Sequence, residues 1–399
     1  MTVRIILLIL AVAPLVYYLF SCYCAFDYFR AARSGRALSD SWMPPVSILK
    51  PVRGADREAY ENFASFCRLD YPEYEIVFAA TDPEDPAVPV IQRLQRNFPD
   101  CNIRLVTSVA HLGANNKVNN LCSLVHEATY ELLVMSDSDV RVDRDYLRNV
   151  VAPFADPQVG AVTSFYRSVA GRGLVSELDA LGMYTDSAPA ALVARKLEGK
   201  MKFAFGWTMA TTKNVLSAIG GFEAMVNHHS DDFELGNRVS RLGYQVVLMQ
   251  KPVWMICPEE SLEEYLKHEL RWSIGLRNVR PVGYLGMVFT QGLPWALLAA
   301  ILAGTSGWTS LAVAYPLAYL VLRFGVVWIT GVWGLGDAGI ARKLYLVPAR
   351  DAFVFAAWVA GLFCDKIVWR GFSYRVRKGL LVPAEGGKDV SLRAPAHAP

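Results

Sequence analysis

The sequence ELLVMSDSD, residues 131–139, contains the feature that decides the fold. Its first half is a short apolar run, and its second half carries Asp137 and Asp139 one residue apart. A short apolar run bounded by polar residues is typical of a buried β-strand. Ligands of α/β sheets bind outside the carboxyl ends of the strands, where these two aspartates would lie. The stretch therefore predicts a buried strand that ends in an acidic ligand site.

The residues before this stretch alternate between strand-like and helix-like segments. Short apolar runs fill residues 46–49, 75–79 and 103–106, and helix-like stretches fill 57–67, 88–96 and 118–127. Such alternation indicates an α/β domain with a mostly parallel, Rossmann-like sheet. We expect this domain to extend from about residue 40 to residue 280.

Apolar segments that could enter a membrane flank the predicted domain. Residues 1–28 hold an apolar run whose length, tyrosines and lack of a clear cleavage site favour an uncleaved anchor over a signal peptide. Residues 284–368 hold a long apolar block that breaks at 304–307, which predicts a helical hairpin, and then a shorter apolar segment at 352–364. The shorter segment is expected to be re-entrant or interfacial. Residues 369–399 are predicted to form a basic and then disordered tail.

Composition and charge narrow the class of protein. With 53% hydrophobic residues and a mean hydropathy of +0.24, the chain is too apolar for an ordinary soluble protein, and its net charge of +3 gives no indication of nucleic-acid binding. Arg30, Arg33 and Arg36 follow the first apolar run, against Arg4 before it. The positive-inside rule therefore places the α/β domain in the cytoplasm. Arg323, the only charge in the hairpin, either snorkels to the interface or contacts an anionic group.

Asp137 and Asp139 have the chemistry of a divalent-cation site. Two carboxylates on one turn suit Mg²⁺ or Mn²⁺, which would keep coordination positions for diphosphate oxygens. Such a cation would offset charge on a leaving nucleotide diphosphate. A turn that caps the next helix is the alternative for the same residues.

Other polar residues follow the remaining predicted strands. Asp82 comes after the second apolar run and could accept bonds from a uracil or a ribose, or belong to a polar turn with two prolines. Lys50 begins KPVRG (50–54), which could face a diphosphate or form a solvated loop. Lys117 lies in NNKVNN (115–120), which could bind nucleotide and phosphate or cap a helix.

Two motifs lie closer to the second apolar block. Asp231 and Asp232 begin a helix-like stretch; they could cap it, or Asp232 could be the general base that deprotonates an acceptor hydroxyl during attack on an anomeric carbon. One base and an in-line displacement imply inversion of configuration. In HELRW, Arg271 suits a phosphate, and Trp272 either stacks on a sugar or anchors at the bilayer interface. His268 is either an exposed helix residue or a phosphate contact.

This set of motifs resembles the ceramide glucosyltransferase family. The resemblance covers roughly residues 5–380 and rests on residues 50–54, 69–75, Asp82 with 85–87, 117–121, Asp137-Ser138, Asp232 and Arg271-Trp272. It implies an inverting membrane enzyme with a glycosyltransferase-A domain inserted between transmembrane helices. It also implies a nucleotide-sugar donor, a membrane-lipid acceptor and a divalent cation, Mg²⁺ or Mn²⁺.

The resemblance assigns roles to the candidate residues. It implies nucleotide binding by Asp82 and Asp137, metal binding by Asp137 or Asp139, base catalysis by Asp232, and contact with diphosphate and acceptor by Arg271 and Trp272. Lys50 and Lys117 are expected to complete the nucleotide-sugar site, and His268 is a candidate acceptor contact.

His268 departs from the usual Gln or Arg at its position, and the HELRW form looks like the bacterial hopanoid-associated branch of the family. Two pairs of substrates therefore stay open: UDP-glucose with ceramide, and UDP-N-acetylglucosamine with a hopanoid such as bacteriohopanetetrol. The expected location is the bacterial inner membrane. A processive polysaccharide synthase would need more spans to form a channel. A non-catalytic lipid-binding relative would be favoured by loss of Asp139 or Asp232, and both are present.

Overall fold

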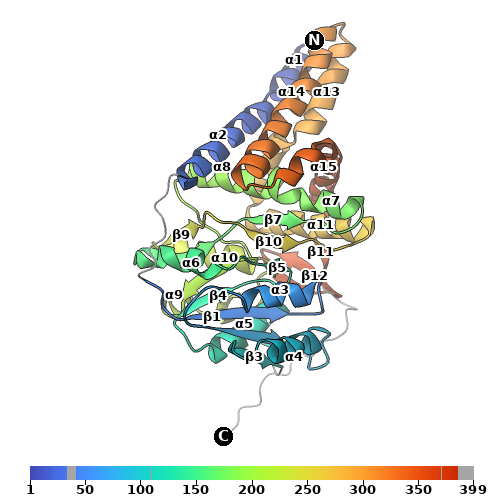
Figure 1. Cartoon of the computed structure of the whole chain (residues 1–399). Coiled ribbons are helices and arrows are strands. Elements are labelled where there is room, and N and C mark those ends of the chain that lie inside the picture. The colour runs from blue at the N-terminus through green and yellow to red at the C-terminus, as the bar shows by residue number, and fades with distance from the viewer. Residues whose placement is uncertain (34–41, 108, 370, 385–399) are drawn as a thin grey trace.

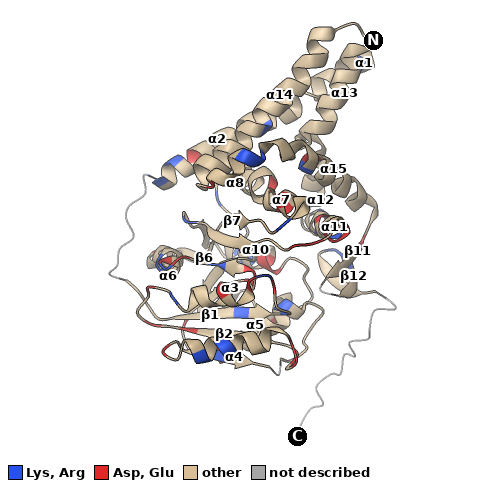
Figure 2. Ribbon diagram, turned by 45° about the vertical axis from the view of Figure 1, so that its right-hand side comes forward, with Lys and Arg blue, Asp and Glu red and all other residues tan. Residues whose placement is uncertain are grey.

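The computed structural model describes residues 1–33, 42–107, 109–369 and 371–384. Figure 1 shows an α/β domain joined to an elongated bundle of helices, with the amino terminus at the far end of the bundle. Helices α7 (Leu174–Ala180) and α8 (Ala188–Glu198) lie between these two parts. Figure 2 shows that charged residues are concentrated in the α/β domain and near the base of the bundle.

The first half of the α/β domain follows the predicted alternation closely. It consists of β1 (Val46–Val52), α3 (Ala59–Phe66), β2 (Tyr74–Ala80), α4 (Ala87–Asn97), β3 (Ile103–Val106), α5 (Asn116–Glu127) and β4 (Leu132–Met135). Strands β1 and β4 are buried along their whole length, as expected for central strands of a covered parallel sheet. The predicted strands at 103–106 and 132–135 have the observed bounds, because short apolar runs between polar turns mark both ends.

The second half adds strands of mixed direction. It contains β5 (Val140–Arg141), α6 (Tyr146–Val151), β6 (Val159–Thr163), β7 (Tyr166–Val169), β8 (Met209–Thr212), α9 (Lys213–Ala218), α10 (Asp231–Arg241), β9 (Gln245–Leu248) and β10 (Val253–Ile256). The main sheet has the order β3-β2-β1-β4-β8-β6-β9. Its first four strands are parallel, and β8 runs antiparallel to both β4 and β6. The predicted α/β class and the mostly parallel sheet are confirmed, with β8 as the exception.

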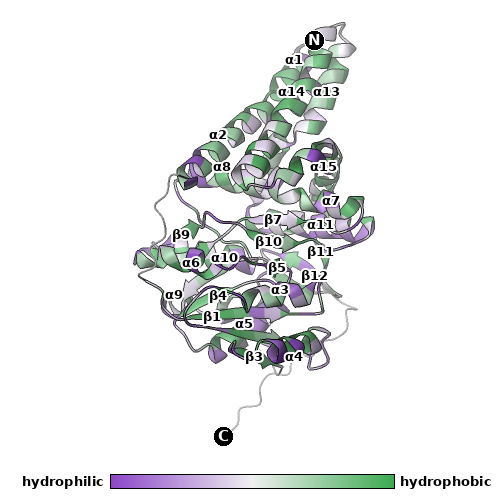
Figure 3. Cartoon of the chain, viewed as in Figure 1, coloured by the Kyte–Doolittle hydropathy of each residue, from purple (hydrophilic) through white to green (hydrophobic). Residues whose placement is uncertain are grey.

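The helical bundle combines both ends of the chain. It contains α1 (Thr2–Leu10), α2 (Ala13–Arg33), α13 (Gly292–Gly304), α14 (Thr309–Val327), the π-helix η5 (Trp328–Gly334) and α15 (Val347–Phe363). The predicted hairpin is confirmed, because α13 ends at Gly304 and α14 starts after a four-residue turn. Figure 3 shows that this part of the chain is predominantly hydrophobic.

Several helical stretches meet the size requirement for a membrane span. Among the described residues, Thr2–Arg33, Thr309–Gly334 and Ala338–Phe363 are long and apolar enough, and Pro281–Thr290 with Gly292–Gly304 would add a fourth if this pair, bent by 46°, is one span. The last of the three is longer than the 352–364 segment predicted from the sequence. Polar residues in the first part of this helical stretch interrupt the apolar pattern, so the sequence pattern alone underestimated its length.

The segment after α15, which includes the basic first part of the predicted tail, is folded. Strands β11 (Lys366–Trp369), β12 (Phe372–Arg377) and β13 (Leu380–Pro383) form an antiparallel sheet. Tyr374, Val376 and Leu381 of this sheet form one apolar cluster with Ile274 of α11 (Leu262–Val279). The alternating apolar residues of this short basic segment were not predicted to form a sheet, because the apolar face of α11 that they pack against lies about a hundred residues earlier. The remainder of the predicted disordered tail, 385–399, lies outside the described residues.

Candidate active site

Four charged side chains from three elements meet beside the carboxyl end of β4. Asp137 follows β4, Lys117 lies in the first turn of α5, and Asp231 and Asp232 begin α10. The Lys117 ammonium lies 2.8 Å from Oδ1 of Asp137 and 3.3 Å from Oδ2 of Asp231. The sheet and the two helix starts thus bring together residues that are separated by up to 115 positions in the sequence.

Gly206, in the loop before β8, packs against this cluster. Its backbone N–H donates to Oδ2 of Asp232 at 3.0 Å. A Cβ atom here would lie 2.9 Å from Nζ of Lys117 and 3.1 Å from Oδ2 of Asp137, so a larger residue would displace the charged groups. Gly206 was not among the predicted site residues, because a single glycine between Phe205 and Trp207 forms no recognisable motif.

The environment adapts Asp232 to proton transfer near neutral pH. Burial, and next the negative charge of Asp231, raise the pKa of Asp232 to about 6. For Lys117, burial acts to lower the pKa, but Asp137, Asp231 and Asp232 outweigh it and raise the pKa above its ordinary value. Lys117 is therefore a permanent cation, and Asp232 is a carboxylate that can take and release a proton in the physiological range.

Lys50 occupies a different place from the one predicted. Its side chain is fully buried, its Nζ donates to the backbone oxygen of Asp137 at 2.8 Å, and it lies 3.8 Å from the centre of the Phe66 ring. Burial lowers the pKa of Lys50 to about 7. Lys50 thus supports the loop that carries Asp137, and its expected contact with the nucleotide sugar stays a prediction. The sequence placed Lys50 after the first strand, whereas β1 continues through it to Val52.

Asp82 lies at the same edge of the sheet but outside the cluster. It is exposed, and its Oδ1 accepts a bond from the N–H of Glu84 at 2.9 Å, which closes a turn after β2. Its neighbour Asp85 is buried and accepts from the N–H of Gly54 at 2.9 Å, so it ties the loop after β2 to the loop after β1.

The asparagines around Lys117 hold the backbone. Asn115 caps α5 by accepting from the N–H of Val118 at 3.2 Å, Asn119 bonds to both backbone groups of Gly113, and Asn120 donates to the backbone oxygen of Ala79 at 3.2 Å. The helix-cap interpretation is therefore correct for Asn115, and nucleotide binding by this segment stays a prediction. Lys117 is the member of the segment that faces the acidic cluster.

Asp137 and Asp139 supply two hard carboxylates on one loop. Among the residues that the structure describes, no group of three or more His, Cys, Asp or Glu side chains is arranged to hold a metal ion. The backbone oxygen of Asp139 accepts from the N–H of Ile256 at 3.0 Å, which fixes the loop against β10. This donor set fits a hard cation that takes few protein oxygens and completes its shell from a diphosphate.

Helix α11 carries the three residues of the HELRW motif that were singled out. The Arg271 guanidinium lies 5.6 Å from the centre of the Trp369 ring in β11. Trp272 is 47% exposed, and the His268 ring lies 5.9 Å from it. His268 Nδ1 also lies 3.5 Å from a carboxylate oxygen of Glu260. Trp369 was missed by the sequence analysis, which assigned it to the tail.

The carboxyl-terminal sheet also contacts the loop that leads to Asp231. The N–H of Leu381 donates to the backbone oxygen of Asn227 at 2.7 Å, and the N–H of His229 donates to that of Gly379 at 2.9 Å. On the loop after β1, Arg53 lies 4.4 Å from the centre of the Phe372 ring in β12. The sheet therefore braces α11, the start of α10 and the loop after β1 at once.

Comparison with known proteins identifies the family. The family model described as "Glycosyl transferase family 21" matches residues 6–382, which is nearly the whole chain. The chain belongs to glycosyl transferase family 21. The expected kinship with ceramide glucosyltransferases is confirmed.

Relatives and solved structures agree with this family 21 assignment. Ceramide glucosyltransferase 3 of Caenorhabditis elegans is 24% identical over 249 residues, covering 62% of this chain and 54% of the relative. Ceramide glucosyltransferase 1 of the same organism is 23% identical over 354 residues, covering 85% and 73%. The chain thus spans only about half to three quarters of these relatives.

The fold has a solved counterpart. The mannosyltransferase PcManGT from Pyrobaculum calidifontis, in complex with GDP-Man and Mn²⁺, superposes with a TM-score of 0.52 at 18% identity, over 90% of this chain and 99% of that chain. This confirms the expected glycosyltransferase-A fold.

Proposed function

We propose that this family 21 enzyme transfers a hexose from a UDP-sugar to a hydroxyl group of a membrane lipid, with inversion of the anomeric configuration. The observation that carries the proposal is Asp232. It lies at the carboxyl edge of the sheet with a pKa raised to about 6, beside Lys117 and the loop of Asp137 and Asp139. A carboxyl group with this pKa, next to cationic and acidic groups that suit a diphosphate and its cation, supports Asp232 as the base.

The reaction follows from these positions. The acceptor hydroxyl gives its proton to Asp232 while its oxygen forms a bond to the anomeric carbon. The bond between that carbon and the diphosphate oxygen breaks, and the electron pair leaves with the nucleoside diphosphate. Gly206 N–H donates to Oδ2 of Asp232, and Phe233 N–H, in α10, donates to Oδ1 at 2.7 Å. Backbone groups therefore orient both carboxylate oxygens. One displacement with one base gives inversion.

The leaving diphosphate needs positive charge. Asp137 and Asp139 would hold Mg²⁺ or Mn²⁺, and the cation would offset the charge of the leaving group. Lys117 and Arg271 are proposed as direct cationic contacts, and Asp82, exposed after β2, as a contact of the nucleoside. Lys50 supports the loop that carries Asp137 by donating to the backbone oxygen of Asp137.

A membrane lipid is the acceptor that best suits the architecture. Helix α11 carries the exposed Trp272 and makes its most extensive packing with α15, so the acceptor side of the site adjoins the helical bundle. Because transferring an acyl chain to water costs about 0.8 kcal/mol per CH₂, a site at the membrane avoids extracting the lipid. Relatives named ceramide glucosyltransferase support a sphingolipid, and the HELRW form keeps a hopanoid as the second candidate.

The proposed location is a bacterial inner membrane with the α/β domain in the cytoplasm. Arg30 and Arg33 lie in the last turn of α2, where this helix reaches the α/β domain. The basic residues thus lie on the side of the bundle that faces the catalytic domain, as the positive-inside rule requires for a cytoplasmic domain.

Product identification tests the proposal directly. Membranes containing the protein would receive radiolabelled UDP-glucose or UDP-N-acetylglucosamine together with ceramide or bacteriohopanetetrol, and membranes with Asp232→Asn would be the control. We expect label in one glycolipid of inverted configuration, identified by chromatography and by linkage-specific glycosidases. Label in a soluble acceptor or in a polymer, or a product of retained configuration, would contradict the proposal.

A further inference from the structure

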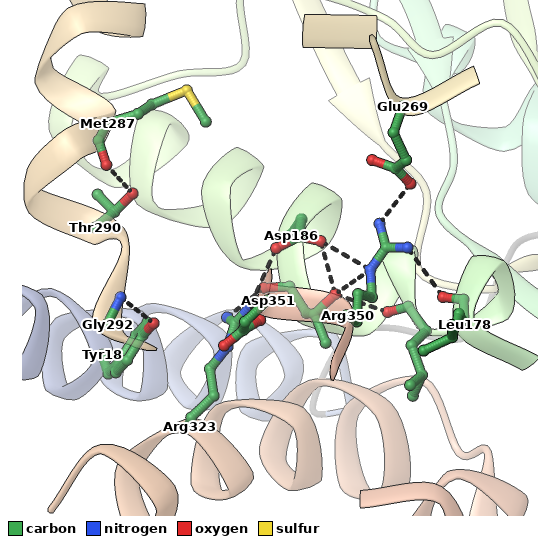
Figure 4. Close-up of polar contacts among 12 residues, drawn as sticks. Tyr18, Leu178, Asp186, Glu269, Met287, Thr290, Gly292, Arg323, Arg350 and Asp351 are labelled. Atoms are coloured by element: carbon green, nitrogen blue, oxygen red, sulfur yellow. Dashed lines mark hydrogen bonds and ion pairs between the residues drawn. The ribbon is translucent and has the colours of Figure 1, made fainter. Parts of the chain in front are cut away.

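A network of charged residues joins the helical bundle to the catalytic domain. Arg323 comes from α14, Arg350 and Asp351 from α15, Asp186 from the π-helix η2 (Met183–Ser187), and Glu269 from α11. Figure 4 shows these five side chains converging from the bundle, the connecting segment and the catalytic domain. The reaction described above does not use this cluster.

Arg323 forms the bundle side of the network. Its guanidinium lies 2.6 Å from Oδ1 of Asp351 and 3.1 Å from Oδ1 of Asp186, and it donates to the backbone oxygen of Thr185 at 2.7 Å. Tyr319, one turn earlier in α14, donates to the other oxygen of Asp351 at 2.9 Å. Of the two alternatives for this arginine, contact with an anionic group is therefore the correct one, and the group belongs to the protein.

Arg350 forms the catalytic side. It lies 3.1 Å from a carboxylate oxygen of Asp186 and 3.1 Å from one of Glu269, and Nη1 donates to the Tyr265 hydroxyl at 2.8 Å and to the backbone oxygen of Leu178 at 2.9 Å. Only 5% of its side chain is exposed. Gly182 makes room for it, because a Cβ there would lie 2.7 Å from Nη2.

Helix α11 therefore has two differently engaged faces. Tyr265 and Glu269 lie four residues apart, on one face of the helix, and both contact Arg350. Arg271 lies two residues beyond Glu269, which is about 200° around the helix, and contacts Trp369 instead. Any rotation or shift of α11 that loosened its contact with Arg350 would also move Arg271 and Trp272.

The chemistry of the network favours a geometric role. Replacing a buried ion pair with apolar residues of similar volume is often neutral or stabilising, so buried charge is weak evidence for stability alone. A guanidinium presents five donors in a rigid planar fork, which fixes both the direction and the distance of its partners. Asp186 contacts both arginines, so the two halves of the network are mechanically connected.

We propose that Arg350 and Glu269 are positioning residues through which the membrane region sets the place of α11, and with it the acceptor side of the active site. The proposal rests on the proposed transfer to a lipid. When the pair is intact, α11 holds Arg271 and Trp272 in the position relative to the helical bundle that transfer requires. When the pair is broken, Lys117 and Asp137 keep their places in the donor site and only Arg271 of the proposed donor contacts moves with α11. The lipid hydroxyl then no longer meets the sugar, while donor binding is weakened less.

The test compares Glu269→Gln and Arg350→Lys with a matched control, Glu263→Gln, in the full-length protein. Glu263 is a glutamate of the same helix, 77% exposed, paired with Lys267. Measured quantities are transfer to the lipid acceptor, hydrolysis of the UDP-sugar without acceptor, and KM for each substrate. We expect both variants to lose ~10-fold or more in kcat/KM for the lipid and to change clearly less in donor KM and donor hydrolysis, because Arg271 is the proposed donor contact that lies on α11. Glu263→Gln should match wild type in each quantity.

The double variant and a conservative exchange complete the design. Because the two residues act as one contact, the combined loss in the double variant should be close to that of either single variant, not their product. Glu269→Asp, which keeps the charge, should retain more lipid transfer than Glu269→Gln. Equal losses of lipid transfer and donor hydrolysis, or multiplicative losses, would overturn the proposal. If wild-type protein turned over UDP-sugar without glycosylating any lipid, the proposed function itself would fail.

Discussion

Replacement of Asp232 by asparagine is the sharpest test of the catalytic site. The amide keeps the size of the side chain, and its oxygen can still accept the bond that Gly206 N–H donates at 3.0 Å. Lys117 keeps its ion pairs with Asp137 and Asp231. The substitution therefore removes the ability to take a proton while leaving the surrounding contacts in place.

The expected magnitude follows from the role. Loss of a general base lowers turnover by ~10² to 10⁴-fold, which corresponds to about 2.7 kcal/mol or more of transition-state stabilisation. Donor KM should change little, since Asp232 makes no proposed contact with the nucleotide. In wild type, the pKa of about 6 predicts that turnover falls as pH drops through this value, because the base form is lost. Between pH 7 and pH 5 the deprotonated fraction falls about tenfold.

Asp231→Asn provides a matched comparison. The charge of Asp231 is, after burial, a cause of the raised pKa of Asp232, so its removal should shift the acidic limb of the pH profile to lower pH. Initial rates of glycolipid formation from pH 4.5 to 9, with saturating donor, measure both effects. Near-wild-type turnover of Asp232→Asn, or an acidic limb that survives in this variant unchanged, would refute the assignment of Asp232 as the base.

Three further expectations concern the cation, the acceptor and the orientation. Asp139→Ala should weaken donor binding, and a chelator should abolish activity that Mg²⁺ or Mn²⁺ then restores; full activity after exhaustive chelation would exclude the cation. Trp272→Ala should impair transfer to a lipid more than hydrolysis of the donor, and a water-soluble acceptor head group should be a poor substrate; equal rates for soluble and lipid acceptors would place the acceptor away from the membrane. A reporter that is active only outside the cytoplasm, fused after Ala384, should stay silent; an active reporter would mean that this end of the chain lies across the membrane.

Much of the catalytic domain could be predicted because its signals are local. Each of β1 to β4 is a short apolar run between polar turns, and each intervening helix is readable within about a dozen residues. Asp137, Asp139 and Asp82 were placed correctly at strand ends for the same reason. The hairpin of α13 and α14 was equally clear, since its turn interrupts an otherwise continuous apolar block.

Other features depended on partners that no sequence window contains. Lys50 was predicted to follow the first strand, but β1 extends through it and the sheet buries it, with its Nζ bonded to the backbone oxygen of Asp137. The sequence of the β11–β13 segment is short and basic, and it folds because α11 supplies an apolar face. The interruption of the last apolar segment by Arg350 and Asp351 was taken as the limit of a short segment, whereas these charges are neutralised by residues from α11, α14 and η2.

The sequence by itself therefore determined the class of fold, the membrane-length segments, and which residue types could perform glycosyl transfer. Periodicity, turn residues and closely spaced carboxylates are properties of neighbouring residues, so they can be recognised without three-dimensional information. The tertiary structure decided which of these residues meet: Lys117 with three aspartates, Gly206 beneath them, and Arg350 with α11. Burial and proximity between distant segments set the pKa of Asp232 and the position of α11, and both arise only when the chain has packed.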